Sequence, residues 1–62
     1  MKKGEYYVHY KNRKVYEIVE VAKCRDGGPD VVVYREARYE PTDIYWRFAT
    51  AFKRKFSLHK EQ

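Results

Sequence analysis

The chain has 62 residues, enough for one domain with a thin core that buries roughly 60% of the surface its unfolded chain exposes. The net charge of +5 favours an anionic partner such as nucleic acid, a nucleotide or an acidic protein, although a soluble lysine-rich surface explains it equally well. A lone cysteine, Cys24, excludes an intramolecular disulfide and is consistent with the cytoplasm, and no apolar run is long enough to span a membrane.

The first half of the chain predicts two strands joined by a tight turn. Residues 5–10 place Tyr6 and Val8 on one face and mixed side chains on the other, as a half-buried strand does. The polar residues 11–14, which include Asn12, predict a hairpin turn. Residues 15–24 form a second strand whose apolar parity changes near Val19, which predicts a β-bulge there.

Residues 31–38 give the strongest strand signal in the chain. Three consecutive valines precede Tyr34 and Arg35, a pattern typical of a strand covered on both faces, so we expect it inside the sheet rather than at an edge. The preceding residues 26–30 contain two glycines and a proline and predict a plain hairpin loop. They lack the lysine and the following helix of a phosphate-binding loop.

The segment from residue 41 to residue 56 is ambiguous. Apolar side chains recur every four residues, as on an amphipathic helix, at Ile44, Phe48, Phe52 and Phe56. Against a helix, residues 44–46 favour a strand, and residues 55–59 alternate as a short strand does. The pattern alone favours the helix slightly and leaves a strand–turn–strand open.

Several short motifs together resemble a small bacterial and phage domain-of-unknown-function family. Its members read K-G-x-Y-x-H-Y-K-G-x-x-Y-E-V, then V-A, then V-V-Y-R, and finally L-W-V-R-P-x-x-M-F. The matching stretches here are Gly4-Glu5-Tyr6, His9-Tyr10-Lys11, Tyr16-Glu17-Ile18, Val21-Ala22, Val32-Val33-Tyr34-Arg35, Ile44-Tyr45-Trp46-Arg47 and Phe52. The departures are Asn12 for glycine, Phe48 for proline, Ala51 for methionine and a tryptophan displaced by one position.

That resemblance implies a mainly β fold for residues 1–62 as a single domain. It takes the form of a small, strongly bent antiparallel sheet or SH3-like barrel with one helical turn near Phe48 and Phe52. It implies no activity, and it makes a phage accessory role a reasonable expectation.

Two arginines are the best candidates for holding an anion. Arg35 and Arg47 each follow an aromatic or β-rich run, where packed rings would fix the guanidinium fork for phosphate or carboxylate. We expect them to be neighbours, with aromatic walls from Tyr34, Tyr45 and Trp46 and long-range attraction from Lys11, Arg13 and Lys14. The structural alternative for either arginine is an ion pair with Glu17, Glu20 or Glu36.

Catalysis is not expected. His9 and His59 have no adjacent nucleophile, and with Cys24 they lack the paired spacing of a structural zinc site, so neither metal nor cofactor is expected. The sequence predicts a non-enzymatic basic binding module for nucleic acid or a nucleotide. The alternative is a phage-encoded inhibitor that docks on a host protein or sequesters a signalling nucleotide as a homo-oligomer. No membrane partner is expected.

Overall fold

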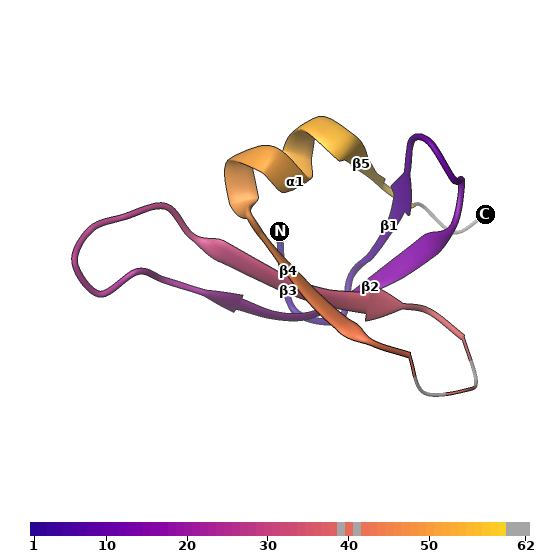
Figure 1. The fold of residues 1–62 in the computed structure, drawn as a ribbon, viewed down its shortest axis with the longest axis horizontal. Coiled ribbons are helices and arrows are strands. Elements are labelled where there is room, and N and C mark those ends of the chain that lie inside the picture. Colours follow the sequence, from indigo (N-terminus) through magenta and orange to yellow (C-terminus); the bar gives the residue numbers. More distant parts are fainter. Residues whose placement is uncertain (39, 41, 60–62) are drawn as a thin grey trace.

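Five antiparallel strands and one short helix make up the part of the chain that the structure describes. The computed structural model describes residues 1–38, 40 and 42–59. The elements are β1 (Tyr6–His9), β2 (Val15–Ala22), β3 (Val31–Glu36), β4 (Ile44–Phe48), α1 (Ala49–Lys55) and β5 (Phe56–Leu58). The strands form one open sheet in the order β4-β3-β2-β1-β5 (Figure 1). The predicted mainly β fold with a short helix near the C-terminus is therefore confirmed, as an open sheet.

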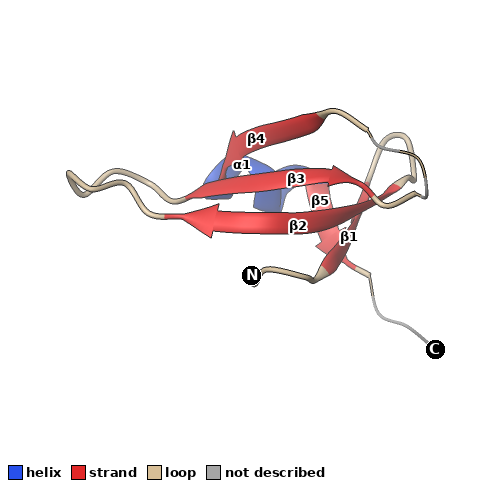
Figure 2. Ribbon diagram, turned by 90° about the horizontal axis from the view of Figure 1, so that it is seen from below, coloured by secondary structure: helices blue, strands red, loops and turns tan. Residues whose placement is uncertain are grey.

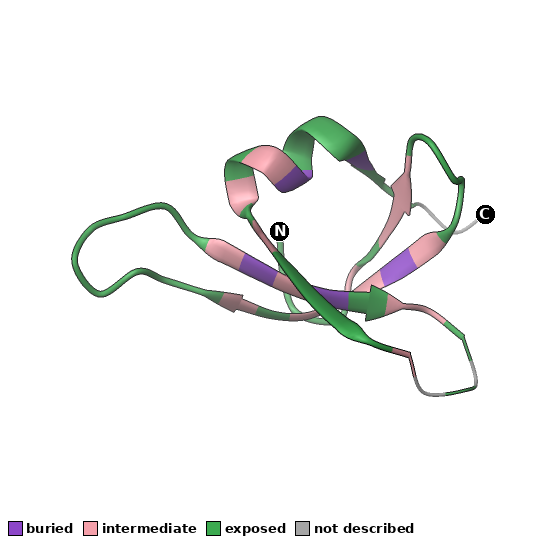
Figure 3. Cartoon of the chain, in the orientation of Figure 1, coloured by how far each residue is buried: buried purple, intermediate pink, exposed green. Residues whose placement is uncertain are grey.

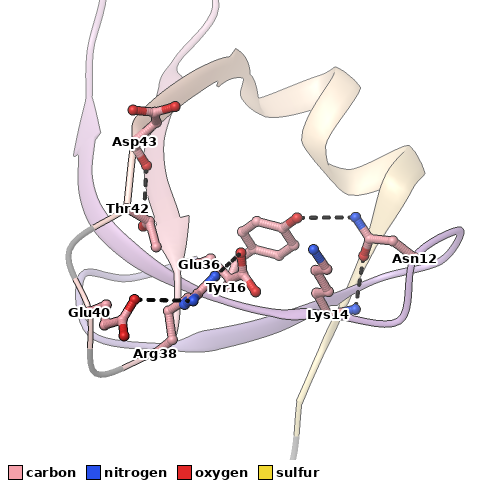
Figure 4. Close-up of polar contacts among 8 residues, drawn as sticks. All are labelled: Asn12, Lys14, Tyr16, Glu36, Arg38, Glu40, Thr42 and Asp43. Atoms are coloured by element: carbon pink, nitrogen blue, oxygen red, sulfur yellow. Dashed lines mark hydrogen bonds and ion pairs between the residues drawn. The ribbon is translucent and has the colours of Figure 1, made fainter.

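The β1–β2 turn is formed by the predicted polar residues. The N–H of His9 donates to the carbonyl of Lys14, which closes the hairpin. Within the turn the Asn12 Oδ1 accepts from the Lys14 N–H at 2.8 Å (Figure 4), and Arg13 adopts a φ of 62°. The asparagine thus replaces a backbone partner in the turn, as Asx turns do.

The predicted bulge is present in β2. The pairing of β2 with β3 shifts register between Ile18 and Glu20, so Val19 is the extra residue. Because of this insertion, Ile18 and Val21 point to the same face although their numbers differ in parity. The change of apolar parity in the sequence therefore has a structural cause.

One face of the sheet, here called the inner face, carries the core. Its buried sheet residues are Tyr16 and Ile18 of β2 and Val32 and Tyr34 of β3. Phe52 of α1 and Phe56 of β5 cover them from the other side, and Figure 3 shows buried positions on β2, β3, α1 and β5. Aromatic contacts dominate: the rings of Phe52 and Phe56 stack 4.0 Å apart, and both meet Tyr34 edge-on at 5.2–5.3 Å. Aromatic packing of this kind suits a core too thin for many aliphatic layers.

The other face of the sheet, here called the outer face, is not covered by any described element (Figure 2). Val32 is fully buried on the inner face, whereas Val31 and Val33 lie on the outer face and are half-buried. The prediction of a strand covered on both faces is therefore wrong, and the prediction that it lies inside the sheet is confirmed, since β3 pairs with both β2 and β4. A run of valines reflects β-propensity as well as burial, and here propensity accounts for two of the three.

The ambiguous C-terminal segment contains both kinds of structure. Ile44 and Phe48 belong to β4, where they are 61% and 46% exposed, and Phe52 and Phe56 belong to the core. The four-residue stripe was therefore not one helix face. The seven-residue helix α1 begins directly after β4 and is longer than the expected single turn. Helices this short need tertiary packing for stability, and Phe52 supplies it. No helix in the described residues is long and apolar enough to cross a membrane.

Candidate functional site

A small pocket opens on the inner face beside the C-terminal end of α1. It has a volume of about 170 Å³ and rests on the ring of Phe56. Its polar walls come from four strands and a turn: His9, Asn12, Tyr16, Tyr34, Tyr45 and Arg47. We call it the Arg47 pocket. Strand alternation builds it, because paired residues of neighbouring strands share a face, and Tyr34 pairs with Tyr45 as Val32 pairs with Arg47.

Arg47 is held in place by neutral groups. Its Nε donates to the Tyr34 hydroxyl at 2.8 Å, and its guanidinium carbon lies 5.9 Å from the centre of the Phe56 ring. Within the described residues, no carboxylate forms an ion pair with Arg47. The positive charge is therefore oriented by the fold and not neutralised by it, which leaves the terminal nitrogens for an external acceptor.

Two of the three tyrosine hydroxyls of the pocket accept a hydrogen bond within the protein and are still available as donors. Tyr34 accepts from Arg47, and Tyr16 accepts from the Asn12 Nδ2 at 3.1 Å (Figure 4). The orientation of the Asn12 amide is fixed by the bond from Lys14 to its Oδ1. A hydroxyl that accepts one bond still has its own hydrogen to donate. The pocket therefore has more donors than acceptors, which is the complement of an anion.

His9 adds to this excess. Its Nδ1 accepts from the Lys11 N–H at 3.1 Å, so the neutral ring carries its proton on Nε2. Burial lowers the pKa of His9 below 6.5, and the nearby charges of Arg47, Lys55 and Lys11 lower it further. The ring packs edge-on against Phe56 at 4.7 Å. These contacts favour the neutral imidazole and reflect the positive potential at this end of the sheet.

Three residues predicted for the site lie in or beside the pocket. Arg47 and Tyr34 are part of it, and Tyr45 forms its rim, 45% exposed, with its ring 5.8 Å from that of Tyr34. The cationic turn residues Lys11, Arg13 and Lys14 are all exposed in the β1–β2 turn. Of these, Lys11 is the one whose charge acts on His9.

Arg35 and Trp46 do not belong to the pocket. Arg35 lies on the outer face, where its Nε and Nη2 both donate to the Glu17 Oε1 at 3.3 Å. The expectation that Arg35 and Arg47 are neighbours is therefore wrong, and the alternative ion pair with Glu17 is what forms. Trp46 also lies on the outer face, 61% exposed, with its ring against Phe48.

Sequence reasoning did not assign His9, Asn12, Tyr16 or Phe56 to the site. The available signal was the alternation itself: Tyr7, His9 and Tyr16 share the inner face of the β1–β2 hairpin. The sequence did not predict where α1 ends. It therefore did not predict that Phe56 packs over that hairpin.

A wider hollow of about 470 Å³ lies elsewhere, among Tyr6, Glu17, Ala37 and Arg38. Its arginine is balanced by acids, since Arg38 lies within 3.8 Å of the Glu36 carboxylate and 3.6 Å of the Glu40 carboxylate (Figure 4). It therefore offers an anion no net positive charge, and size alone does not make it the better candidate.

Comparison with known proteins identifies a family but no activity. No curated protein and no solved structure matches the chain. A family model described as protein of unknown function (DUF1653) matches residues 5–62, which include every strand and the helix. The chain therefore belongs to this family of proteins of unknown function.

Proposed function

We propose that this protein is a non-enzymatic cytoplasmic binding module that recognises an anionic ligand, nucleic acid or a nucleotide, through the Arg47 pocket. The observation that carries the proposal is the excess of donors around an arginine with no acidic partner in the described residues. A phosphate oxygen accepts from guanidinium, hydroxyl and imidazole N–H groups alike. The net charge of +5 supports attraction of such a ligand over longer distances.

The test compares two arginines of opposite placement. Arg47→Ala removes the fork from the pocket, and the matched control Arg35→Ala removes the same charge from the outer face. A charge-assisted hydrogen bond contributes about 1.5–3 kcal/mol, so Arg47→Ala should weaken binding by about 10- to 150-fold. Arg35→Ala should change it by much less. Affinity is measured by calorimetry with adenosine monophosphate and by gel shift with single-stranded DNA, each at two salt concentrations.

Salt dependence and stability complete this test. The weak effect of Arg35→Ala should vanish at high salt, because it acts only through screened long-range charge. Thermal melts should show that Arg47→Ala remains folded. The proposal fails if Arg47→Ala binds as the wild type does, or if it unfolds while its folded fraction keeps full affinity.

A second candidate function, protein interaction as a homo-oligomer, is favoured by the edge strand β4. The N–H of Ala49 donates to the carbonyl of Asp30. In an antiparallel pair every second residue forms its backbone hydrogen bonds with the neighbouring strand, so the N–H and C=O groups of Ile44, Trp46 and Phe48 point away from β3. The same three residues have exposed apolar side chains. An apolar edge with no charge or proline among these residues is unusual in a monomer.

We propose that the occupant of this edge is a second copy of the chain, paired antiparallel around Trp46. That pairing places Ile44 of one copy opposite Phe48 of the other, so the contact is self-complementary. In this candidate function the assembly is the inhibitor or nucleotide-sequestering oligomer that the sequence suggests. Light scattering should report a dimer or larger at high micromolar concentration, and Trp46→Lys should be monomeric. A clean wild-type monomer at that concentration would overturn it.

A further inference from the structure

A second pocket shares His9 with the Arg47 pocket. It has a volume of about 150 Å³ and is lined by His9, Tyr10, Lys11, Arg54 and Lys55. We call it the Lys55 pocket. Its walls are fixed to one another, because the Tyr10 N–H donates to the Lys55 carbonyl at 2.9 Å and so joins the end of β1 to the end of α1 (Figure 1). His9 lines both pockets, so the two lie next to each other at this residue.

The Lys55 pocket gathers cations without acids. Lys11 comes from the β1–β2 turn, and Arg54 and Lys55 come from the last turn of α1. None of the three forms an ion pair with a carboxylate in the described part of the chain. Cations in the last turn also stabilise a helix through its dipole, but that effect does not account for Lys11, which belongs to another element.

The sizes of the pockets limit what each can hold. Binding sites for drug-sized ligands have volumes of about 300–1,000 Å³, and each pocket is well below that range. Each has room for a phosphate-sized group and too little for a whole nucleotide. A ligand that uses both pockets therefore presents one charged group to each.

We propose, building on the function proposed for the Arg47 pocket, that the ligand carries two phosphate groups, one held by Arg47 and the other by Lys11 and Lys55, with the His9 ring between them. Both a nucleoside bisphosphate and two successive phosphates of a nucleic-acid strand have this chemistry. Each phosphate receives donors from at least two elements of the fold, so neither subsite depends on a single flexible side chain.

The two phosphates reverse the electrostatic surroundings of His9. Without ligand, the charges of Arg47, Lys11 and Lys55 act on the ring, Arg54 lines the second pocket with it, and the centre of the Tyr16 ring lies 6.4 Å from its centre. Bound phosphates on both sides favour the protonated ring, which can then donate from both nitrogens. Binding of a two-phosphate ligand should therefore raise the pKa of His9 from its lowered value, more than binding of a one-phosphate ligand does.

The test compares ligands with one and two phosphates and a matched pair of lysines. Calorimetry measures the affinity of the wild type for adenosine monophosphate, adenosine 3′,5′-bisphosphate and a short oligothymidylate. We expect the bisphosphate to bind about tenfold more tightly than the monophosphate, or better. Lys55→Ala should cancel most of that gain, and Lys53→Ala, which removes an equal charge from the same turn outside the pocket, should keep it.

The outcomes separate this inference from the proposal on which it rests. If monophosphate binding depends on Arg47 but the second phosphate adds nothing, or if Lys53→Ala and Lys55→Ala have equal effects, the two-phosphate inference is overturned and the Arg47 pocket stands. If neither nucleotide nor the oligothymidylate binds, both are overturned. Tight oligothymidylate binding with weak bisphosphate binding supports the inference and identifies a strand as the source.

Discussion

Two neighbouring valines of β3 provide a sharp test of which sheet face forms the core. Val32 is fully buried among the aromatic rings, whereas Val33 lies on the outer face opposite Trp46 and is half-buried. On the usual range per residue, the free energy of unfolding of a 62-residue chain is roughly 3–9 kcal/mol. A carboxylate without a partner at Val32 costs several kcal/mol, so Val32→Asp should not fold. Val33→Asp places its charge at the surface and should fold, with a loss of about 1–2 kcal/mol from lost packing and β-propensity.

Milder substitutions give the same comparison as numbers. Val32→Ala removes two buried methyl groups, about 1.6 kcal/mol at 0.8 kcal/mol per group, and leaves a cavity, so about 2–3 kcal/mol in total. Val33→Ala should cost about 1 kcal/mol, because water already reaches the side chain. In a domain this small each kcal/mol lowers the melting temperature by about 4–8 °C, which circular dichroism resolves. Equal melting temperatures for the two alanine variants, or a folded Val32→Asp, would refute the assignment of the inner face.

Three further outcomes are expected. Phe52→Ala should cost about 3–5 kcal/mol, because its ring is fully buried and stabilises α1, and a urea titration should show unfolding at a much lower urea concentration than in the wild type. Because the pKa of His9 is lower in the folded chain, the free energy of unfolding should decline as the pH falls below 6.5. His9→Gln should lack this decline, and a free energy of unfolding that rises on acidification would contradict the prediction. Tyr34→Phe removes the acceptor of Arg47, so it should cost about 1 kcal/mol of stability and weaken nucleotide binding less than Arg47→Ala does.

The hairpins could be predicted from the sequence because their signals are local. The turn at Asn12, the bulge at Val19 and the inner position of β3 in the sheet each depend on residues within a few positions of one another. The C-terminal segment could not be assigned in this way. Ile44 and Phe56 are spaced as on one helix, but Ile44 lies in β4 and Phe56 is part of the core. The position of the helix is determined by the tertiary packing of Phe52.

For the site, alternation along a strand was a constraint that the sequence prediction did not apply. Tyr34 and Arg35 are consecutive strand residues, and so are Tyr45 and Trp46, so only one of each pair can face the pocket. Arg47 lies beside Tyr34, as expected. The same alternation places Arg35 on the opposite face of the sheet, away from Arg47. The contribution of the β1–β2 hairpin to the pocket, above all that of His9, depends on how α1 and β5 pack over the hairpin. No local sequence pattern encodes that packing.

The pairing of β1 with β5 also has a consequence for synthesis of the chain. Tyr7 lies opposite Leu58, so β1 meets β5, and β5 begins at Phe56, directly after the helix that carries Phe52. On the ribosome, β1, β2 and β3 can emerge and pair in sequence, but their apolar face has no cover until α1 and β5 have left the exit tunnel. The emergence of α1 and β5, rather than the appearance of the hairpins, is then the event that completes the core. A stalled or truncated chain that lacks β5 would expose the apolar inner face of the sheet. Chaperones or proteases would then bind it.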